Sequence, residues 1–555
     1  MSPESACGTL VAWVASAEDV RVVTSGVRLA ERLAGLVCLL MVLCTPQASA
    51  TLAGGSVVSA SAFGLPEYGA GATAGVLPAD EPQVVNFLVV GDFNGDGRPD
   101  VMAVRALYQS NRTFPVVVLL NQGNGTFVDQ TSSVFDGAPP QTMDARRVVV
   151  ADFNGDGRPD VFIADEGQDV IPNLGHQNTL ILSAPGRKLV DATANLPQRS
   201  DFSHALAVGD VNGDGSPDLF VGNLGDANSS ILLNDGHGHF HDEPNGIPAD
   251  LADPGRSIIT SAVFADVNRD GSPDLIVGGG SNGLYSTVPV VLLNNGHGGF
   301  PSVSSRLPLP PGGFNSPVDF QTADLNGDGY PDIVASYVRT PGSTGRYIQI
   351  LINKGNGTFR DETRSRLPQQ RTDGTWIKAI HLIDLNGDGA LDIATAVVPS
   401  APPWDEPPPF YLNDGHGNFT ALPPGLGAGA GDVYNFIDAF GNSERDIVYT
   451  LNNSSVELIR EQTPHGHRLY ATVTGKGAVS LVSDQGPRAR IRAGHHQLVV
   501  WDQDAQARFN LTGPGVNVHT STGSVISFLT VRLRAGGQYR YSGGPGHHGT
   551  IRVAA

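Results

Sequence analysis

The chain has 555 residues, a formal net charge of −20 and only 16% charged residues. Because its length exceeds that of one ordinary domain, we expect at least two hydrophobic cores. An acidic chain of this kind offers no basic surface to nucleic acid or to an anionic membrane, which excludes both as partners. Gly (69) and Pro (39) are abundant, which indicates many turns but not a disordered chain.

Residues 1–50 are typical of an export signal. Arg28 and Arg32 precede the apolar run Leu33–Cys44, and the small residues Ala48–Ala50 follow as a cleavage site. About a dozen apolar residues are too few to cross a bilayer, so we expect a secreted protein with no membrane span after cleavage. Cleavage removes all 3 cysteines and with them any disulfide or thiolate ligand. The Gly- and Ala-rich residues 51–81 predict a linker.

A ten-residue segment, Gly91-Asp92-Phe93-Asn94-Gly95-Asp96-Gly97-Arg98-Pro99-Asp100, recurs along the chain. Counted from its first aspartate, five further copies begin at Asp152, Asp210, Asp266, Asp324 and Asp384. A degenerate seventh copy begins at Asp438, with Asn442 and Asp446 at its fifth and ninth positions. Self-similarity at a fixed spacing of this order indicates a repeat architecture.

Each repeat predicts four short strands. In the first repeat, Phe87–Val90 leads into the motif, Val101–Val104 leaves it, and Val117–Asn121 ends in an Asn/Gly turn. We expect a phenylalanine to open the fourth strand, as at Phe127, Phe240, Phe300, Phe359 and Phe419. This pattern is typical of propeller blades, so we predict an all-β fold with a seven-bladed β-propeller over residues 82–460. The alternative, a linear β-solenoid, would have shorter repeats and need capped ends.

The motif copies resemble the FG-GAP/VCBS repeats of the integrin α-chain propeller and its bacterial relatives. The resemblance covers about two-thirds of the chain. It implies a propeller that binds an extracellular protein or a polysaccharide.

The motif also has the donor set of a calcium site. Asp at positions 1, 5 and 9 and Asn at position 3 bring four oxygen-bearing side chains to one loop, and the position-7 carbonyl adds another oxygen. Three carboxylates this close repel one another unless a cation is present. Calcium accepts many oxygen ligands, whereas zinc prefers nitrogen or sulfur. An EF-hand is excluded because it needs Glu at position 12, where the first copy has Ala103.

We therefore predict about six structural Ca²⁺ ions, and none in the seventh copy, which lacks the Asn and the Gly. An Asn/Asp/Gly turn without metal is the alternative for any single copy. The predicted ligands are Asp92, Asn94, Asp96, Arg98 and Asp100; Asp152, Asn154, Asp156, Arg158 and Asp160; Asp210, Asn212, Asp214, Ser216 and Asp218; Asp266, Asn268, Asp270, Ser272 and Asp274; Asp324, Asn326, Asp328, Tyr330 and Asp332; and Asp384, Asn386, Asp388, Ala390 and Asp392.

Residues 461–555 no longer follow the repeat. Short alternating strands at 469–473, 498–501, 525–533, 539–541 and 550–553 predict a β-sandwich. Phe509–Val516 and Leu533–Tyr541 resemble parts of a bacterial cupredoxin. That family would follow the second stretch with Cys and His ligands to copper, where this chain has Ser542–His547. Because a blue-copper centre needs both ligand types, we predict no copper.

The residues six positions before the motif aspartates are mostly polar, although they stand where inner strands approach a packed axis. They are Asn86, Arg146, His204, Thr260, Val318 and Lys378. Polar groups beside aromatic rings suit sugars or protein surfaces, so we predict ligand binding by Arg146, His204, Lys378, Trp376 and Trp404. Loop decoration and local packing are the alternative for each residue taken singly.

The sequence has no His-Glu-x-x-His and no phosphate-binding loop before a helix, and we predict no catalytic residues. We expect a secreted, calcium-binding, non-catalytic recognition or adhesion module. The alternative is a structural component of the cell envelope or a non-catalytic subunit of an extracellular enzyme.

Overall fold

The computed structural model describes residues 67–554 with gaps, the longest of which are 280–287, 398–409 and 422–432. The predicted signal segment 1–50 and residues 51–66 lie outside the described residues, as do Trp404, Asn386, Asp388 and Asn442. The described elements are almost all β-strands, which confirms the predicted fold class. Among the described residues, no helix is long and apolar enough to cross a membrane.

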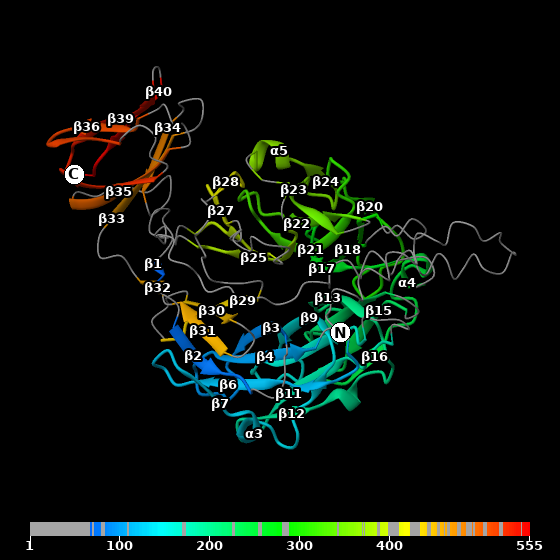
Figure 1. Cartoon of the computed structure of the whole chain (residues 1–555). Coiled ribbons are helices and arrows are strands. Elements are labelled where there is room, and N and C mark those ends of the chain that lie inside the picture. Colours follow the sequence, from blue (N-terminus) through cyan, green and yellow to red (C-terminus); the bar gives the residue numbers. More distant parts are fainter. Residues whose placement is uncertain are drawn as a thin grey trace, which may run out of the picture.

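The repeats form four-stranded antiparallel sheets, here called blades and numbered in chain order (Figure 1). Blade 1 comprises β3 (Val84–Gly91), β4 (Asp100–Ala106), β6 (Val117–Asn121) and β7 (Phe127–Asp129). Blade 2 comprises β9 (Ala145–Ala151), β10 (Asp160–Asp165), β11 (Thr179–Ala184) and β12 (Lys188–Asp191). Blade 3 comprises β13 (Ser203–Gly209), β14 (Asp218–Asn223), β15 (Ser230–Asn234) and β16 (Phe240–Asp242).

The next three blades follow the same order from inner to outer strand. Blade 4 comprises β17 (Ser261–Ala265), β18 (Asp274–Gly278), β19 (Val290–Leu292) and β20 (Ser305–Arg306). Blade 5 comprises β21 (Ser316–Ala323), β22 (Asp332–Arg339), β23 (Thr344–Asn353) and β24 (Phe359–Asp361). Blade 6 comprises β25 (Ile377–Ile383), β26 (Asp392–Val397), β27 (Phe410–Asn413) and β28 (Phe419–Ala421).

Blade 7 joins the two ends of the repeat region. Its strands β29 (Tyr434–Ile437), β30 (Asp446–Leu451) and β31 (Ser455–Ile459) come from the last repeat, and its outer strand β2 (Ala72–Val76) comes from the first described residues. Residues 72–76, assigned to the linker from sequence, thus belong to the propeller. Their side chains are mostly small, and a Cβ at Gly75 would be in tight contact with the Phe127 carbonyl oxygen, at 3.1 Å.

The remaining described elements around the blades are short strand pairs and single helical turns. Two small pairs, β1 (Glu67–Tyr68) with β32 (Glu461–Gln462) and β5 (Phe114–Pro115) with β8 (Gln141–Thr142), lie outside the blades. Single turns of helix are α3 (Thr131–Val134), η3 (Thr193–Asn195), α4 (Ala249–Ala252) and α5 (Thr363–Arg366).

One strand prediction is wrong. Phe300 does not open the fourth strand of blade 4, which is β20 and begins at Ser305. Pro301, which follows Phe300, lacks the backbone N–H that a paired strand would use. The Phe300 N–H instead bonds the Gly246 carbonyl at 2.7 Å, and the fully buried ring fills the space between blades 3 and 4.

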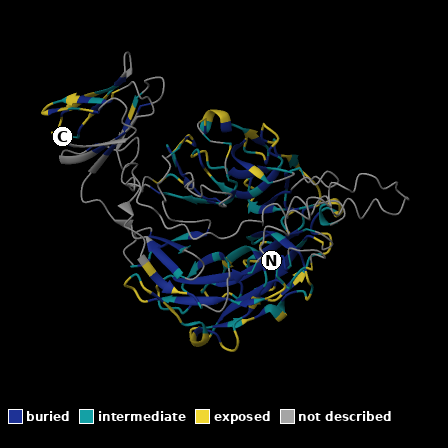
Figure 2. Ribbon diagram, viewed as in Figure 1, coloured by how far each residue is buried: buried dark blue, intermediate teal, exposed yellow. Residues whose placement is uncertain are grey.

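The hydrophobic core is divided among the interfaces between neighbouring blades. Separate clusters of buried side chains join blade 7 to blade 1 and then each pair in turn to blades 5 and 6. Between blades 6 and 7, the rings of His381 and Tyr434 lie 5.1 Å apart. Figure 2 shows buried residues along the strands and exposed ones at the loops. Each fully buried Phe at such an interface contributes about 1.5–3 kcal/mol, so blade-to-blade packing is a major source of stability.

Buried asparagines tie each blade to the one before it. In five blades the asparagine of the third strand or its end donates from Nδ2 to the carbonyl of motif position 2 in the preceding blade. The pairs are Asn121–Ala439 (3.1 Å), Asn234–Phe153 (2.8 Å), Asn294–Val211 (2.8 Å), Asn353–Val267 (2.8 Å) and Asn413–Leu325 (3.0 Å). The first pair links blade 1 to blade 7, so the ties continue across the closure of the ring.

Blade 2 has Ser183 where those five blades have this asparagine. There the carbonyl of Phe93 in blade 1 accepts instead from Arg158, at 3.2 Å from Nη2. The same guanidinium donates to the Ala184 carbonyl of its own blade at 2.7 Å. Arg158 therefore takes over the tie between blades 1 and 2.

The contact that Arg158 makes between blades 1 and 2 can be tested by comparing two alanine variants. We expect Arg158→Ala to lower the free energy of unfolding by about 2–3 kcal/mol, because it leaves carbonyls at the interface without a donor. Arg98→Ala, at the same motif position in blade 1, removes a side chain that is 45% exposed and should cost about 1 kcal/mol or less. Urea unfolding followed by tryptophan fluorescence measures both. Equal losses in the two variants would contradict the proposed tie.

The C-terminal residues form a separate β-sandwich. One sheet has the order β34 (Val479–Ser483), β33 (His467–Val473), β35 (Gly494–Asp502) and β38 (Ile526–Leu533), with β33 and β35 parallel. The other has the order β37 (Val516–His519), β36 (Asn510–Gly513), β39 (Gln538–Gly544) and β40 (His547–Arg552). A single core with Leu498, Leu511 and Tyr539 lies between the two sheets. The five predicted strands of this region are all present.

Candidate metal-binding loops and axial cavity

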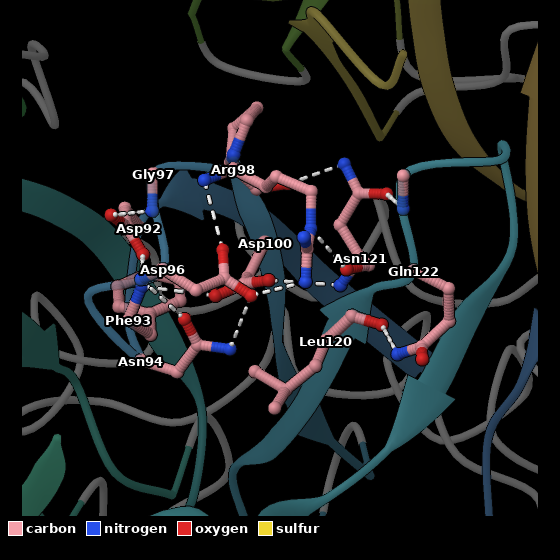
Figure 3. Close-up of polar contacts among 12 residues, drawn as sticks. Asp92, Phe93, Asn94, Asp96, Gly97, Arg98, Asp100, Leu120, Asn121 and Gln122 are labelled. Atoms are coloured by element: carbon pink, nitrogen blue, oxygen red, sulfur yellow. Dashed lines mark hydrogen bonds and ion pairs between the residues drawn. The ribbon is translucent and has the colours of Figure 1, made fainter. Parts of the chain in front are cut away.

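The first five motif copies each form a tight loop between the first and second strands of their blade. In the first loop the two carboxylate oxygens of Asp92 accept hydrogen bonds from the backbone N–H groups of Asp96 (2.9 Å) and Gly97 (2.8 Å) (Figure 3). Gly97 has a φ of 87°, a left-handed conformation that glycine adopts without strain. The side chains at positions 1, 3 and 5 therefore sit around one turn of backbone.

The same pattern recurs in the later copies. The position-1 carboxylate accepts from the backbone N–H of position 5 in the loops that begin at Asp152, Asp210, Asp266 and Asp324, and from that of position 6 in all of these and in the loop at Asp384. The sequence repeat is thus a repeat of loop geometry. Asn386 and Asp388 of the sixth loop are not described.

The position-9 aspartate is the buried anchor of each loop. Asp100 is fully buried, and its two oxygens accept from the backbone N–H groups of Phe93 (3.1 Å) and Asn121 (2.8 Å). The degenerate seventh copy keeps part of this anchor, because Asp446 accepts from Ala439 at 3.1 Å. Position 9 therefore has a structural role in joining the loop to the third strand, with or without a metal ion.

Electrostatic repulsion adds to the effect of burial on the pKa of the position-9 aspartates. Burial, and then the negative charges of Asp96 and Asp92, raise the pKa of Asp100 to about 7. The same causes raise the pKa of Asp218, Asp274 and Asp332 to about 6. A divalent cation among these carboxylates would favour their charged forms.

The loops differ in how position 5 is neutralised. In the first loop, the Arg98 guanidinium forms an ion pair with the Asp96 carboxylate (Figure 3). The corresponding positions in loops 3 and 4 are Ser216 and Ser272, whose backbone N–H groups bond the position-5 carboxylate without bringing a charge. The first loop therefore holds a cationic side chain where a metal ion would compete for the same carboxylate.

The loop residues fit calcium in their chemistry but are not gathered as a metal cluster. Within the part of the chain that the structure describes, no three Asp, Glu, His or Cys side chains form a group that could hold a metal ion. The position-1 and position-5 carboxylates accept from the loop backbone instead. All donors of the motif are oxygens, the set that calcium prefers, and small side-chain rotations would be needed for them to converge.

The predicted ligand-face residues turn out to be β-bulges. In blades 1, 2, 3, 5 and 6, the register between the inner and second strands shifts by one residue at Asn86, Arg146, His204, Val318 and Lys378. A bulge bends the strand and re-aims the side chain of the extra residue. This explains why polar residues recur at that register beside the axis.

Most of these bulged side chains contact another blade. Asn86 Nδ2 donates to Asp144 Oδ1 at 2.8 Å, and Lys378 Nζ donates to the Asn86 carbonyl at 3.2 Å. His204 Nδ1 lies 3.4 Å from the Thr260 carbonyl, and burial, together with Arg146 and Arg147, lowers the pKa of His204 to about 3. Arg146 forms an ion pair with Glu166, while Trp376 lies half-buried just before β25. The structure thus brings Arg146 and His204 together electrostatically.

A cavity of about 610 Å³ lies along the inner strands β3, β9, β21, β25 and β29. Sequence analysis missed most of its polar lining, namely Arg147, Asp319, Gln321, His381 and Asn435. Arg147 of blade 2 donates to the Val318 carbonyl of blade 5. Burial raises the pKa of the neighbouring Asp319, and the charge of Arg147 offsets part of this rise. A sequence signal existed, since these polar residues interrupt otherwise apolar strands.

Comparisons with known proteins agree with this architecture. A family model described as an FG-GAP-like repeat matches residues 89–163, 210–277, 266–335 and 337–395. The chain is 31% identical to cartilage acidic protein 1 of Mus musculus over 185 residues, which are 32% of this chain and 27% of that protein. It is 24% identical to the T-cell immunomodulatory protein of Homo sapiens over 343 residues, 56% of this chain and 51% of that protein. The chain therefore spans about a quarter and about a half of these two relatives.

Solved structures with similar folds include an Agrocybe aegerita lectin that recognises non-reducing terminal N-acetylglucosamine. Its TM-score is 0.39 at 21% identity, covering 63% of this chain and 81% of the lectin. The V. cholerae biofilm matrix protein Bap1 has a TM-score of 0.31 at 12% identity, covering 86% of this chain and 88% of its own. Likenesses at such TM-scores support no conclusion about function. The matched repeats and the four-stranded blades together show that the chain carries FG-GAP-like repeats folded as a β-propeller.

Proposed function

We propose that this protein is a secreted, calcium-binding β-propeller that recognises an extracellular protein or carbohydrate and catalyses no reaction. The observation that carries the proposal is that different kinds of residue lie at the two ends of the inner strands. At one end the motif loops and the asparagine ties hold the blades rigidly together. At the other end, bulged polar side chains surround the axis next to a cavity.

Calcium would be held by positions 1, 3, 5 and 9 and by the position-7 carbonyl of each of the six intact loops. Bound there, it would neutralise the carboxylates and fix the turn between the first and second strands. The raised pKa of Asp100, Asp218, Asp274 and Asp332 is consistent with this: burial is its main cause, and the neighbouring carboxylates of each loop, which a cation would neutralise, add to it. The ion would have a structural role.

Differences between the blades at the bulged positions favour recognition over a purely structural role. The motif positions are nearly identical from blade to blade, whereas the bulged residues differ: Asn86, Arg146, His204, Val318 and Lys378. A scaffold that only had to hold itself together would have no need of a different polar group at four of these five sites. Rigid scaffolds that present diverse polar groups are common among binding proteins.

A glycan array and a panel of extracellular matrix proteins, each probed with and without a calcium chelator, test the proposal. We expect binding to at least one ligand that disappears with chelator and returns with added calcium. Blank results on both panels with folded protein would contradict a recognition role and favour a structural component of the envelope or a subunit of another enzyme.

A further inference from the structure

In three consecutive blades, the inner strands place a polar residue at the same register beside the axial cavity. These three residues are here called the polar tier. Gln321, His381 and Asn435 each lie three residues before the first aspartate of their motif, on β21, β25 and β29, and all three line the cavity. At the same register the other four blades have Val89, Val149, Ala207 and Val263. Since valine or alanine serves the fold at this register, the polar residues of blades 5 to 7 need another explanation.

Aromatic rings form the wall beside this tier. The His381 ring lies 5.1 Å from that of Tyr434 and 6.0 Å from that of Phe436, and the last two rings lie 5.8 Å apart. Phe87 of blade 1 lines the same cavity, with the Lys378 ammonium 5.4 Å from its ring centre. One side of the cavity is therefore aromatic, and the opposite side carries Arg147 and Asp319 of blades 2 and 5.

Hydrogen-bonding capacity in the cavity exceeds what the described residues use. Asn86 is only 3% exposed, and its Oδ1 has no hydrogen-bond partner among the described residues. Its Nδ2 is already held by Asp144 Oδ1 and the Ala145 carbonyl, which fixes the direction in which the oxygen points. A buried acceptor without a donor costs about 1–3 kcal/mol, so Asn86 is an energetically unfavourable point in the cavity lining.

Two further groups add to this capacity. Gln321 lines the cavity and donates from Nε2 to Asp319 Oδ2 at 3.3 Å, and its amide oxygen is a further acceptor. Burial lowers the pKa of His381 to about 4, so its ring is neutral at physiological pH and offers one donor and one acceptor nitrogen. The cavity thus combines aromatic surface with acceptors and a donor at several heights along the axis.

We propose that this cavity binds a single sugar unit, with its apolar face on the aromatic wall and its hydroxyl groups on Gln321 and His381. This inference rests on the proposed recognition function and names its ligand class and its site. The volume of about 610 Å³ lies within the range of small-ligand sites. The described lining has one carboxylate, Asp319, which is too few for a metal ion.

Ligand-observed NMR and calorimetry on the mature protein test the proposal, with glucose, galactose, N-acetylglucosamine and glucuronic acid as probes. We expect saturable binding of at least one of the four. Gln321→Val, which installs the residue found at this register in blades 1, 2 and 4, should weaken binding at least tenfold. His381→Phe keeps an aromatic ring and removes both nitrogens, and it should have an effect of similar size.

Val263→Ala is the matched control, because it changes the same register in blade 4, outside the cavity, and should leave the Kd unchanged. Circular dichroism and the melting temperature verify that each variant is folded. The proposal is overturned if no probe binds, or if both cavity variants bind as the wild type does. A calcium-dependent hit on the glycan array that survives both variants would overturn this site while leaving the proposed recognition function intact.

Discussion

We expect chelation of calcium from the purified protein to lower its melting temperature by at least about 5 °C, and added calcium to restore it. The expectation follows from linkage, since an ion that binds only the folded loops stabilises them by RT ln(1 + [Ca²⁺]/Kd). With Kd near 10⁻³ M, as in extracellular modules, and roughly tenfold more free calcium, each loop gains about 1.4 kcal/mol. Six loops acting together make the effect large even for a protein of this size.

The measurement is differential scanning calorimetry in calcium and in EDTA, with elemental analysis of the dialysed protein. Asp324→Asn in the fifth loop should reduce the calcium-induced shift, because it removes a charge from position 1. Asp438→Asn, at position 1 of the degenerate seventh copy, is the matched control and should leave the shift unchanged. If the folded protein contains no calcium and EDTA leaves the melting temperature unmoved, the metal assignment is wrong.

The ion pair of Arg98 predicts that the loops differ in how readily they release calcium. Its guanidinium already pairs with Asp96, so the first loop loses less by giving up a metal ion than loops 3 and 4, which have serine at that position. The six loops are therefore not expected to release calcium at one concentration. The first would empty before the others on titration with a weak chelator.

The sequence predicts the parts of this fold that are locally determined. The strands on either side of each motif follow from apolar runs bounded by Asn, Asp and Gly, and the structure confirms them in the first three blades. The outer strand of blade 7 could not be found in this way. Its residues Ala72–Val76 lack the bulky side chains of a typical strand, and their pairing partner β31 lies at the far end of the repeat region.

The axial site shows a different limit. Arg146, His204 and Lys378 were conspicuous because they recur at one register, yet the bulges that explain them depend on strand pairing. Gln321 and His381 looked like isolated polar residues in apolar strands. Only the ring arrangement places them on adjacent blades around one cavity, and that proximity is a property of the closed propeller.

Replacing one inter-blade asparagine tests how far the ring depends on its ties. Asn353 is 4% exposed; its Nδ2 donates to the carbonyls of Val267 (2.8 Å) and Pro331 (3.0 Å), and its Oδ1 accepts from the Gly355 N–H (2.9 Å). Asn353→Ala leaves these backbone groups unpaired between blades 4 and 5. At about 1–3 kcal/mol for each buried group, we expect a loss of about 3 kcal/mol or more in the free energy of unfolding.

The control is Asn356→Ala in the same hairpin, where an exposed asparagine bonds only Thr358 and its removal should cost about 1 kcal/mol or less. Urea midpoints in saturating calcium compare the two without a contribution from metal loss. Two equal midpoints would mean that the packed faces of the blades hold the ring by themselves. A large difference would place the asparagine ties, and with them the Arg158 tie of blade 2, among the interactions that close the propeller.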